Sequence, residues 1–499
     1  MDIFANLSTG FGVALTFQNL SFALAGCLIG TLIGVLPGIG PIPTIAMLLP
    51  LTFHLEPVSG LIMLAGIFYG AQYGGSTTAI LVNLPGETSS VVTCVDGHQM
   101  ARQGRAGAAL AIAALASFFA GTISTAVIAA LAPPLALVGQ SFGAPEYFAL
   151  MVLGLVAAVV LAHGSVVKAI AMIVLGLLLG LVGTDGQTGN QRFAFDLPIL
   201  SDGLDFAVLA IGVFGVGEII SNLVRPEKTA NAQIAVITRL WPTRDDFKAA
   251  WPAALRGTML GSVLGVLPGG GATLSSFAAY VLEKRIARDP SRFGKGAIEG
   301  VAGPEAANNA GAQTSFIPML TLGLPGNAVM ALMIGAMMIH GIQPGPQIMT
   351  ERPGLFWGMI ASMWIGNLML LVINLPLIGI WVQLLKVPYR FLYLAVLLFC
   401  AIGCYMVSNS TVGVLLAALF GVLGYVFIRL ECEPAPMILG FVLGPLMEDN
   451  LRRAMRISSG DPMIFIERPL CLGLLIAAAL LLLMMILPAI RSKREVAFQ

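Results

Sequence analysis

Charged residues are scarce in this chain. Only 10% of its 499 residues are Asp, Glu, Lys or Arg, whereas 57% are hydrophobic. Because a soluble domain carries roughly a quarter charged residues, a chain of this length and composition cannot cover itself with a solvated surface. Its net charge of +1 gives no indication of a nucleic-acid partner. The composition instead predicts a protein whose apolar side chains face lipid.

Several motifs of soluble chemistry are also missing. The chain has no G-x-x-x-x-G-K-[ST] sequence, which excludes ATP hydrolysis through a P-loop, and no H-E-x-x-H zinc motif. Its six cysteines form no C-x-x-C pair, and we interpret them as small buried apolar residues. We therefore expect no cofactor and no resident metal, and we predict that the chain is not an enzyme.

Long apolar runs take the place of charge. Examples that are each about long enough to cross a hydrocarbon core of roughly 30 Å as a helix are Gly107–Ala132, Val166–Gly183, Phe206–Val224 and Leu470–Pro488. Lipid offers no partner for unpaired backbone groups, so the spanning elements must be helices. The sequence predicts an all-α polytopic membrane protein with about 11 to 14 membrane segments, including broken or re-entrant helices.

A basic segment divides the chain near its middle. Lys and Arg outnumber Asp and Glu in Arg225–Arg256, which places this segment in the cytoplasm by the positive-inside rule. The basic tail that begins at Arg491 predicts a cytoplasmic C-terminus as well. We therefore expect a first membrane repeat over residues 1–224, a basic cytoplasmic linker over 225–256, and a second membrane repeat with C-terminal helices over 257–499.

Two motifs recur in the same order in the two halves. The segment Gly30-Thr-Leu-Ile-Gly-Val-Leu-Pro-Gly-Ile-Gly40 matches Gly261-Ser-Val-Leu-Gly-Val-Leu-Pro-Gly-Gly-Gly271. Further along, Leu84-Pro-Gly-Glu87 matches Leu324-Pro-Gly-Asn327. Two ordered matches of this quality indicate an internal repeat.

The charges of the loops predict how the two repeats are oriented. The loop after the first motif is basic in the second half, at Lys284–Lys295, but has no Lys or Arg in the first half, at Thr52–Pro57. The loop after the second motif reverses this, because Arg102 and Arg105 follow it in the first half. Such alternation is typical of two inverted-topology repeats, and it places the N-terminus outside.

Each half contains a break in an apolar segment, at Leu36-Pro-Gly-Ile-Gly-Pro41 and Leu267-Pro-Gly-Gly-Gly-Ala272. Proline removes a backbone donor, and glycine adopts conformations closed to other residues. Inside a membrane the freed groups persist only where protein or a watery cavity satisfies them, and they can bind ions or anionic substrates. The alternative is a kink that eases packing. The candidate binding residues are Gly38, Gly40, Gly269, Gly270 and Gly271.

Polar side chains cluster beside the second motif of each half. Neutral donors suit a carboxylate ligand and their oxygens suit Na⁺, although Ser and Thr with Gly also serve as contacts between membrane helices. The candidates in the first half are Ser76, Thr77, Thr78, Asn83 and Gly86. Those in the second half are Asn308, Asn309, Gln313, Thr314, Ser315, Gly326 and Asn327.

Two carboxylates lie close to these motifs. Glu87 ends the first Leu-Pro-Gly turn, and Glu305 begins the polar stretch of the second half. Ionisable residues inside a membrane are functional candidates by default. We expect Glu87 and Glu305 to bind a coupling ion, Na⁺ or H⁺, and the alternative for each is a loop carboxylate in water.

Five segments carry a resemblance to a known family: Val35–Pro41, Tyr73–Ala79, Leu264–Gly271, Phe293–Gly300 and Pro304–Ala310. They resemble the large membrane subunit of the tripartite tricarboxylate transporters, the TctA family. The resemblance implies a secondary transporter in a bacterial inner membrane that is driven by an ion gradient. It also implies a small membrane subunit and a periplasmic binding protein as partners, and tricarboxylates or dicarboxylates such as citrate as substrates.

Two other functions remain open at this point. A membrane-embedded enzyme would need a nucleophile with a base, or clustered metal ligands. A channel is the second alternative, although matched inverted breaks favour alternating access over an open pore.

Overall fold

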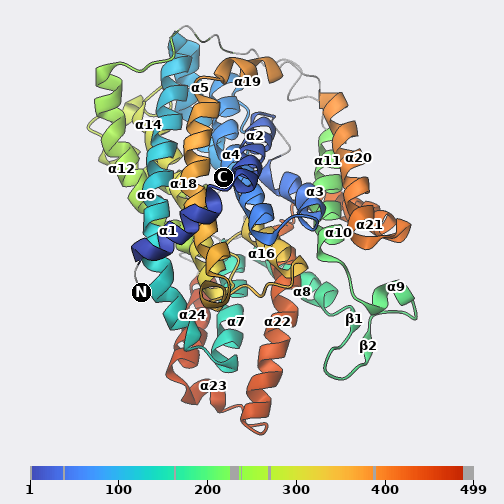
Figure 1. Ribbon diagram of the computed structural model, residues 1–499. Coiled ribbons are helices and arrows are strands. Elements are labelled where there is room, and N and C mark those ends of the chain that lie inside the picture. Colours follow the sequence, from blue (N-terminus) through green and yellow to red (C-terminus); the bar gives the residue numbers. More distant parts are fainter. Residues whose placement is uncertain are drawn as a thin grey trace.

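The computed structural model describes residues 3–36, 40–161, 165–224, 239–267, 271–385 and 389–486, together with Ala235 and Ile237. Helices make up most of this part of the chain (Figure 1). Its one sheet is a hairpin of β1 (Gly183–Thr184) and β2 (Gln191–Arg192), which pair antiparallel with Gly183 opposite Arg192. This helical content agrees with the predicted all-α membrane protein.

The helical elements follow one another in this order: α1 (Ile3–Ala14), α2 (Phe17–Val35), α3 (Pro41–Thr52), α4 (Pro57–Val82), η1 (Thr88–Ser90), α5 (Val91–Met100), η2 (Ala101–Arg105), α6 (Ala106–Gln140), α7 (Ala144–Leu161), α8 (Val166–Gly180), α9 (Pro198–Ser201), α10 (Phe206–Ala210), η3 (Ile211–Val216), α11 (Gly217–Val224), α12 (Arg244–Val266), α13 (Gly271–Ile286), η5 (Pro290–Arg292), α14 (Glu299–Thr314), α15 (Phe316–Leu322), α16 (Ala328–Ile339), α17 (Ile348–Glu351), α18 (Pro353–Asn374), α19 (Ile378–Leu384), α20 (Tyr389–Ser408), α21 (Thr411–Arg429), α22 (Ala435–Ile457), α23 (Ile464–Glu467) and α24 (Pro469–Ile486).

The apolar runs form the helices that the sequence predicts. Within the described residues, five helical stretches are long and apolar enough to cross a membrane, and further apolar helices of 10–17 residues accompany them. The five are Phe17–Val35, Thr88–Gln140, Phe206–Val224, Pro353–Asn374 and Thr411–Arg429. The prediction of interrupted segments agrees with two short helices: α3, which follows the first break, and α16, which follows the second Leu-Pro-Gly turn.

The range of the predicted central linker includes the start of a helix. Helix α12 already begins at Arg244, inside the range 225–256, and residues 225–234 lie outside the described part. The start is fixed by a capping box, in which Thr243 Oγ1 accepts from the Asp246 backbone N–H (3.1 Å) and Asp246 Oδ2 accepts from the Thr243 N–H (3.0 Å). Such a box satisfies two of the orphan donors at a helix start.

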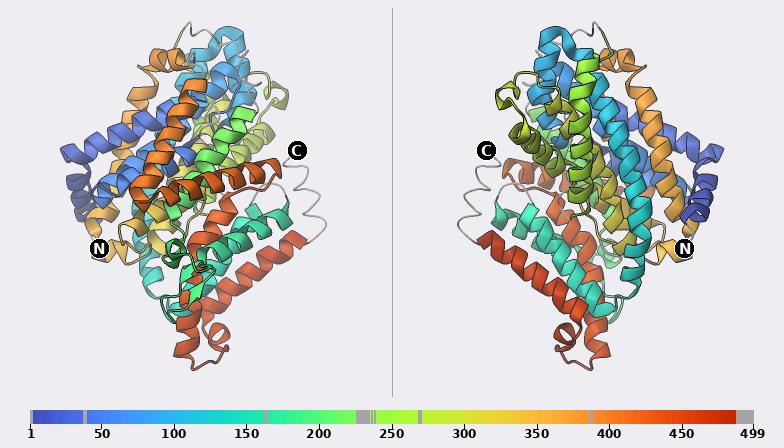
Figure 2. Two further views of the ribbon diagram at one scale, coloured as in Figure 1. Left: turned by 90° about the vertical axis from the view of Figure 1, so that its right-hand side faces the viewer. Right: turned by 90° about the vertical axis from the view of Figure 1, so that its left-hand side faces the viewer.

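The helices pack as three groups. Helices α2, α4, α6, α12, α14 and α18 contact one another in the main bundle. Helices α7, α8, α22, α23 and α24 form a second group, which lies at the bottom in Figures 1 and 2. A third group contains α10, η3, α11, α20 and α21, together with α3, the short helix that follows the first break. The main bundle holds most of the second-motif candidates.

The same spacing of glycine contacts occurs in both halves of the main bundle. Helix α2 presents glycines at every fourth position to the backbone of α4, and α12 does the same to α14. A Cβ on any of them would run into a carbonyl oxygen, so the backbones approach closely only because these residues are glycine. The contacting pairs are Gly26 with Met63, Gly30 with Ile67, Gly34 with Ala71, Gly257 with Gly303, Gly261 with Ala307 and Gly265 with Gly311.

Loops of the two halves meet in two places. In the first, Gln103 Nε2 donates to the Lys295 carbonyl (2.8 Å), and Arg105 pairs with Asp246 near the start of α12. In the second, His340, which follows α16, lies against the Thr52 carbonyl, which ends α3. The basic loops at 101–105 and 284–295 therefore lie together.

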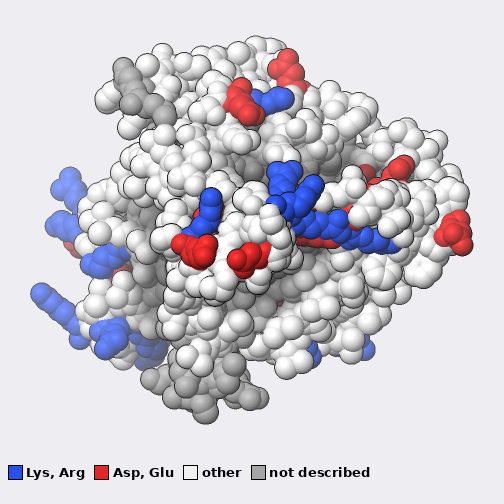
Figure 3. Space-filling model, turned by 90° about the horizontal axis from the view of Figure 1, so that it is seen from below, with Lys and Arg blue, Asp and Glu red and all other residues white. Residues whose placement is uncertain are grey.

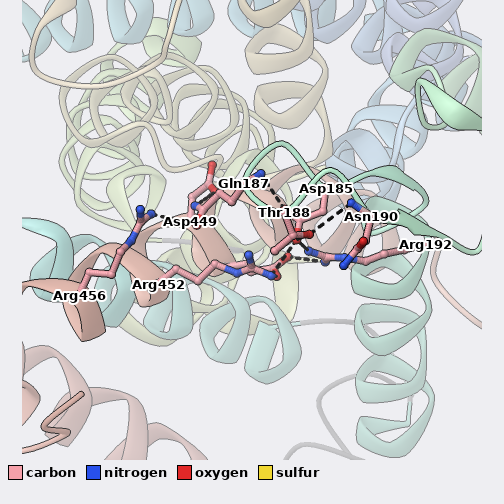
Figure 4. Close-up of polar contacts among 9 residues, drawn as sticks. Asp185, Gln187, Thr188, Asn190, Arg192, Asp449, Arg452 and Arg456 are labelled. Atoms are coloured by element: carbon pink, nitrogen blue, oxygen red, sulfur yellow. Dashed lines mark hydrogen bonds and ion pairs between the residues drawn. The ribbon is translucent and has the colours of Figure 1, made fainter. Parts of the chain in front are cut away.

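A charged cluster fixes the hairpin to the end of α22 (Figure 4). Asp185 pairs with Arg192 and with Arg452 (3.1 Å), and both arginines also bind Glu448, at 2.9 and 2.6 Å. The Gln187 backbone N–H and the Arg192 guanidinium lower the pKa of Asp185. Seen from below, acidic and basic side chains gather near the middle of this face, among large uncharged areas (Figure 3).

Candidate functional site

The Glu305 carboxylate lies at the centre of a buried polar cluster that joins the two halves. Glu305 is 1% exposed on α14. Its Oε2 accepts from Ser76 Oγ on α4 (2.6 Å), and its Oε1 accepts from Thr93 Oγ1 on α5. Helix α4 around Ser76 and helix α14 around Glu305 consist largely of small residues, which lets the carboxylate reach hydroxyls on its neighbours.

Helix α6 and a second residue of α14 complete this cluster. Asn309 Nδ2 donates to Ser117 Oγ (2.7 Å) and to the Glu305 carbonyl (3.2 Å), and Ser117 Oγ makes a longer contact of 3.5 Å with Glu305 Oε2. No Lys, Arg or His bonds to this carboxylate in the part of the chain that the structure describes. A buried charge without a compensating partner is costly, and a cation or a proton beside Glu305 would lower that cost.

A small cavity opens beside Glu305. Its volume is about 10 Å³, which is near the minimum for one water molecule. The lining consists of Tyr73, Ser76, Thr77, Leu110, Ala113, Ala114, Ser117, Glu305 and Asn374. The cavity is large enough for an ion or a water, and far too small for an organic acid.

Glu87 forms a second polar group, directly after the first Leu-Pro-Gly turn. It is the N-cap of η1, where its side chain accepts from the backbone of Ser90 and its Oε1 from Ser89 Oγ. Ser89 also bonds Gln72 Oε1 on α4 (3.0 Å). The fully buried amide of Asn308 lies beside Glu87 without an aligned hydrogen bond to any described residue. The alternative of a water-exposed loop does not fit Glu305, which is buried.

The helix breaks place two candidate glycines at helix N-termini. Gly40 is the N-cap of α3 with a φ of 62°, and Gly271 is the first residue of α13 with a φ of 42°. Both conformations favour glycine. Gly38, Gly269 and Gly270 lie outside the described residues.

The two Leu-Pro-Gly turns have matching geometry. The helix before each turn ends on a left-handed residue, Asn83 at φ 57° and Gly323 at φ 70°. After the turn, Glu87 caps η1 and Asn327 caps α16, where its Oδ1 accepts from the Met330 N–H (3.0 Å). Asn83 thus has a backbone role, and the side chains at the matched positions 87 and 327 both point at a helix start.

Close contacts join these turns to the breaks. Gly86 is pressed against Gly34 and Gly75, so a side chain has no room there, while Gly326 lies near Ser315. The Asn327 side chain lies close to Gly271. Thr88 Oγ1 and Thr273 Oγ1 are 3.0 Å apart, which brings the first turn against α13 of the second half.

Other predicted side chains bond only to backbone. Thr78 Oγ1 donates to the carbonyl of Val35 (2.6 Å), one of the groups freed by the first break. Thr314 and Ser315 bond to carbonyls of their own helix, those of Ala310 and Ala312. Gln313 is buried with its Oε1 unpaired among described residues. These contacts match the alternative of packing for Thr78, Thr314 and Ser315.

Several site residues have no signal in the sequence. Thr93 and Ser117, which bond Glu305, lie on helices that the apolar pattern identifies only as membrane segments. Asn374 lines the cavity from the end of α18. Ser117 and Asn374 stand out in the sequence only as polar residues within apolar runs, and nothing there indicates their shared target.

Asp96 anchors the loop that leads into α14. Its Oδ1 accepts from the N–H groups of Gly294 (2.9 Å), Gly296 (2.8 Å) and Ala297 (2.9 Å), and its Oδ2 accepts from Tyr280 Oη (2.9 Å). Asp96 belongs to α5, the helix that also carries Thr93. One short helix of the first half therefore fixes both the start of α14 and the carboxylate of Glu305.

A larger cavity of about 260 Å³ lies between α6 and α12. Its lining is apolar apart from Thr122, with Phe119 and Trp251 in contact at 4.5 Å between ring centroids. It offers no group that would compensate a carboxylate, so it is not a candidate for binding an organic acid.

One serine motif bears on the alternative of a membrane-embedded enzyme. Gly139-Gln-Ser-Phe-Gly143 has the G-x-S-x-G spacing of a nucleophile elbow. It ends helix α6 instead of joining a strand to a helix, and Ser141 Oγ donates to the Val138 carbonyl (2.6 Å). The described residues also contain no group of three or more His, Cys, Asp or Glu side chains arranged to hold a metal.

Comparison with known proteins identifies the family. The model of the tripartite tricarboxylate transporter TctA family matches residues 20–439. An uncharacterized 52.8 kDa protein in the TAR-I ttuC' 3' region of Agrobacterium vitis is 57% identical over 498 residues, which is 100% of this chain and 99% of the relative. An uncharacterized protein in the TAR-II ttuC' 3' region of the same organism is 57% identical over 238 residues, 48% of this chain and 98% of the relative. No solved structure matches the chain.

The matched residues contain both breaks, both Leu-Pro-Gly turns and the whole Glu305 cluster. Together with the apolar helices, they make the protein a multi-pass membrane protein. Members of this family are components of tripartite transporters, so family membership implies partner subunits. The chain belongs to the tripartite tricarboxylate transporter TctA family.

Proposed function

We propose that this chain imports small organic acids, tricarboxylates or dicarboxylates such as citrate, by coupling their movement to a gradient of Na⁺ or H⁺. The observation that carries the proposal is the buried Glu305 carboxylate, held by hydroxyls of the first half while belonging to the second. An ion bound there would contact both halves at once. Its binding and release would therefore change how the halves fit together, which is what alternating access needs.

An inverted repeat is the architecture that we propose for this movement. The glycine contacts of α2 with α4 and of α12 with α14 share one register. The matched turns share left-handed helix ends and capping side chains. Loops at matched positions also meet in matching pairs, since the loop ending at Lys295 meets Gln103 and Thr52 meets His340. These features support two halves that run through the membrane in opposite directions.

The substrate site in this proposal lies where the two breaks and the two Leu-Pro-Gly turns converge. An organic acid there needs compensation for its charge, and the described breaks carry no Lys or Arg. The groups available are backbone N–H groups at helix N-termini, namely that of Ile42 between Pro41 and Pro43 in α3 and those that follow Gly271 in α13. Neutral side chains such as Asn327 and Thr88 are available as well. A cation bound first at Glu305 would lower the cost of admitting an anion nearby.

The remaining expectations follow the same scheme. We propose that the chain needs no cofactor, works in the bacterial inner membrane with a cytoplasmic C-terminus and a periplasmic N-terminus, and acts with a small membrane subunit and a periplasmic binding protein. Family membership supports the existence of partner subunits. The basic loops that lie together support the orientation.

The test is uptake of radiolabelled citrate and related acids into proteoliposomes that contain this chain with its membrane partner and receive the binding protein outside. Wild type should accumulate substrate when a Na⁺ or H⁺ gradient is imposed and no ATP is present. Glu305→Gln should lose this accumulation. Glu218→Gln, which changes a carboxylate of α11 outside the cluster, should behave as wild type. Accumulation that follows ATP, or that survives Glu305→Gln, would refute the proposal.

A further inference from the structure

The side-chain amide of Asn374 lines the cavity beside Glu305, and its oxygen accepts no hydrogen bond from any described residue. Asn374 is 4% exposed, near the end of α18. Its Nδ2 donates to the Leu370 carbonyl (3.0 Å) and to Thr31 Oγ1 (3.4 Å), whereas its Oδ1 is buried without a hydrogen-bond partner among the described residues. Because Asn374 lines the cavity, its unpaired oxygen is available to a ligand that enters there.

The cavity is lined by oxygen atoms on its polar side. Besides Glu305 and Asn374, the hydroxyls of Ser76, Thr77 and Ser117 border it. Each of these hydroxyls donates its proton to a neighbouring acceptor, which leaves lone pairs on the oxygen for a cation. No nitrogen base or thiol lines the cavity, so its chemistry suits a hard cation with oxygen ligands.

The charge of the lining selects the valence of that cation. Glu305 is the one ionisable carboxylate that borders the cavity, and the other oxygen donors are neutral. A monovalent cation would leave the buried site neutral, whereas a divalent one would leave an uncompensated positive charge in surroundings of low dielectric. Calcium sites use several carboxylates, in contrast to this one.

The cavity also distinguishes Na⁺ from a proton. A proton on Glu305 needs no space and would leave the Asn374 oxygen unpaired, because no hydrogen bond links these two residues among those described. An ion in the cavity would touch both. The volume of about 10 Å³ is that of a single small sphere.

We propose that this cavity binds one Na⁺, with Glu305 supplying the compensating charge and with Ser76, Thr77, Ser117 and Asn374 supplying oxygen ligands. The assignment rests on the proposed function, in which an ion bound at Glu305 drives transport. The site joins α4 and α6 of the first half to α14 and α18 of the second. Na⁺ binding therefore stabilises one arrangement of the two halves before the acid arrives.

The experiment measures ²²Na⁺ binding to the purified full-length chain at pH 8, without substrate. Wild type should bind Na⁺ saturably, with competition by Li⁺ and not by Ca²⁺. Thr77→Val, which removes one ligand and keeps the shape, should weaken binding about tenfold, the loss expected for one hydrogen bond or ligand to a charge. Thr321→Val is the matched control, because Thr321 is a buried threonine that bonds to its own helix at the Ile317 carbonyl (2.7 Å) and does not line the cavity.

Asn374→Leu and Glu305→Gln complete the series. Both should abolish ²²Na⁺ binding, and the thermal stabilisation of wild type by Na⁺ should vanish with it. If wild type binds no Na⁺ while proteoliposomes accumulate citrate on a proton gradient, the Na⁺ site is refuted and the transport proposal stands. Equal binding by Thr77→Val, Asn374→Leu and wild type would refute the ligand assignment.

Discussion

Replacing Asp96 with asparagine should loosen the loop between α13 and α14. The carboxylate is fully buried and accepts three backbone N–H groups on one oxygen, from Gly294, Gly296 and Ala297 at 2.8–2.9 Å. Hydrogen bonds to a charged acceptor contribute about 1.5–3 kcal/mol, whereas neutral ones contribute about 0.5–1.5 kcal/mol. The amide of the Asp96→Asn variant would keep the shape of the acceptor but lose its charge, at roughly 1 kcal/mol for each bond and roughly 3 kcal/mol in total.

Hydrogen exchange measures this loss directly, because the three bonded amides are themselves the reporters. A loss of roughly 3 kcal/mol in local opening corresponds to about a hundredfold faster exchange. The measurement compares wild type with Asp96→Asn in the same detergent or nanodisc, at the amides of residues 294, 296 and 297. Substrate uptake should fall as well, since this loop holds the start of the helix that carries Glu305.

Asp289→Asn is the control from the same loop. Asp289 accepts from the backbone and side chain of Ser291 in an exposed position, at 3.0 and 2.7 Å, and its pKa is lowered by those bonds. Exposed polar contacts contribute little to stability, so exchange at residues 294–297 should change by less than about threefold. If Asp96→Asn leaves these amides as protected as in wild type, the inference that the carboxylate anchors the loop is wrong.

Three other predictions concern the topology, Asn309 and Asp185. Single cysteines at Thr52–Pro57 should be labelled from outside the cell and those at Lys284–Lys295 from inside; labelling of both from one side would disprove the inverted topology. Asn309→Ala leaves Ser117 without its donor and should weaken binding of ion or substrate roughly two- to tenfold, the effect of one neutral hydrogen bond of about 0.5–1.5 kcal/mol, as read by isothermal titration at equal expression. Unchanged affinity would make Asn309 a packing residue. The Gln187 N–H and Arg192 lower the pKa of Asp185. The ionised Asp185 therefore stabilises the hairpin above pH about 4, and this stabilisation is lost as the pH falls below that value. Hydrogen exchange of residues 183–192 that is the same at pH 3 and pH 6, after correction for intrinsic rates, would contradict this.

The sequence predicted the parts of the fold that depend on local pattern. Apolar runs became helices because their length and composition determine their behaviour in lipid without reference to other segments. Pro-Gly interruptions became breaks for a similarly local reason, as Gly40 and Gly271 show with their positive φ. The start of α12 was missed, although Thr243 and Asp246 have the spacing of a capping box, because the basic charge around them favoured a loop.

The contacts of polar side chains were less predictable. Ser76 and Thr78 stand two residues apart in one motif, yet Ser76 reaches Glu305 and Thr78 reaches the Val35 carbonyl. On a helix, residues two apart point in different directions, so the partner depends on which helix packs on each side. The list of candidates could therefore name polar residues but could not separate ligands from helix contacts.

What the sequence determined by itself is the membrane class, the breaks and the order of the two pairs of matching motifs, because hydrophobicity and the conformational limits of proline and glycine act over a few neighbouring residues. Only the tertiary structure decided that Thr93, Ser117 and Asn374 gather around Glu305. Those residues lie on α5, α6 and α18, which meet α14 through packing of helices distant in the chain. A buried carboxylate selects its partners by distance in space, and that distance is set by the close approach of helix backbones.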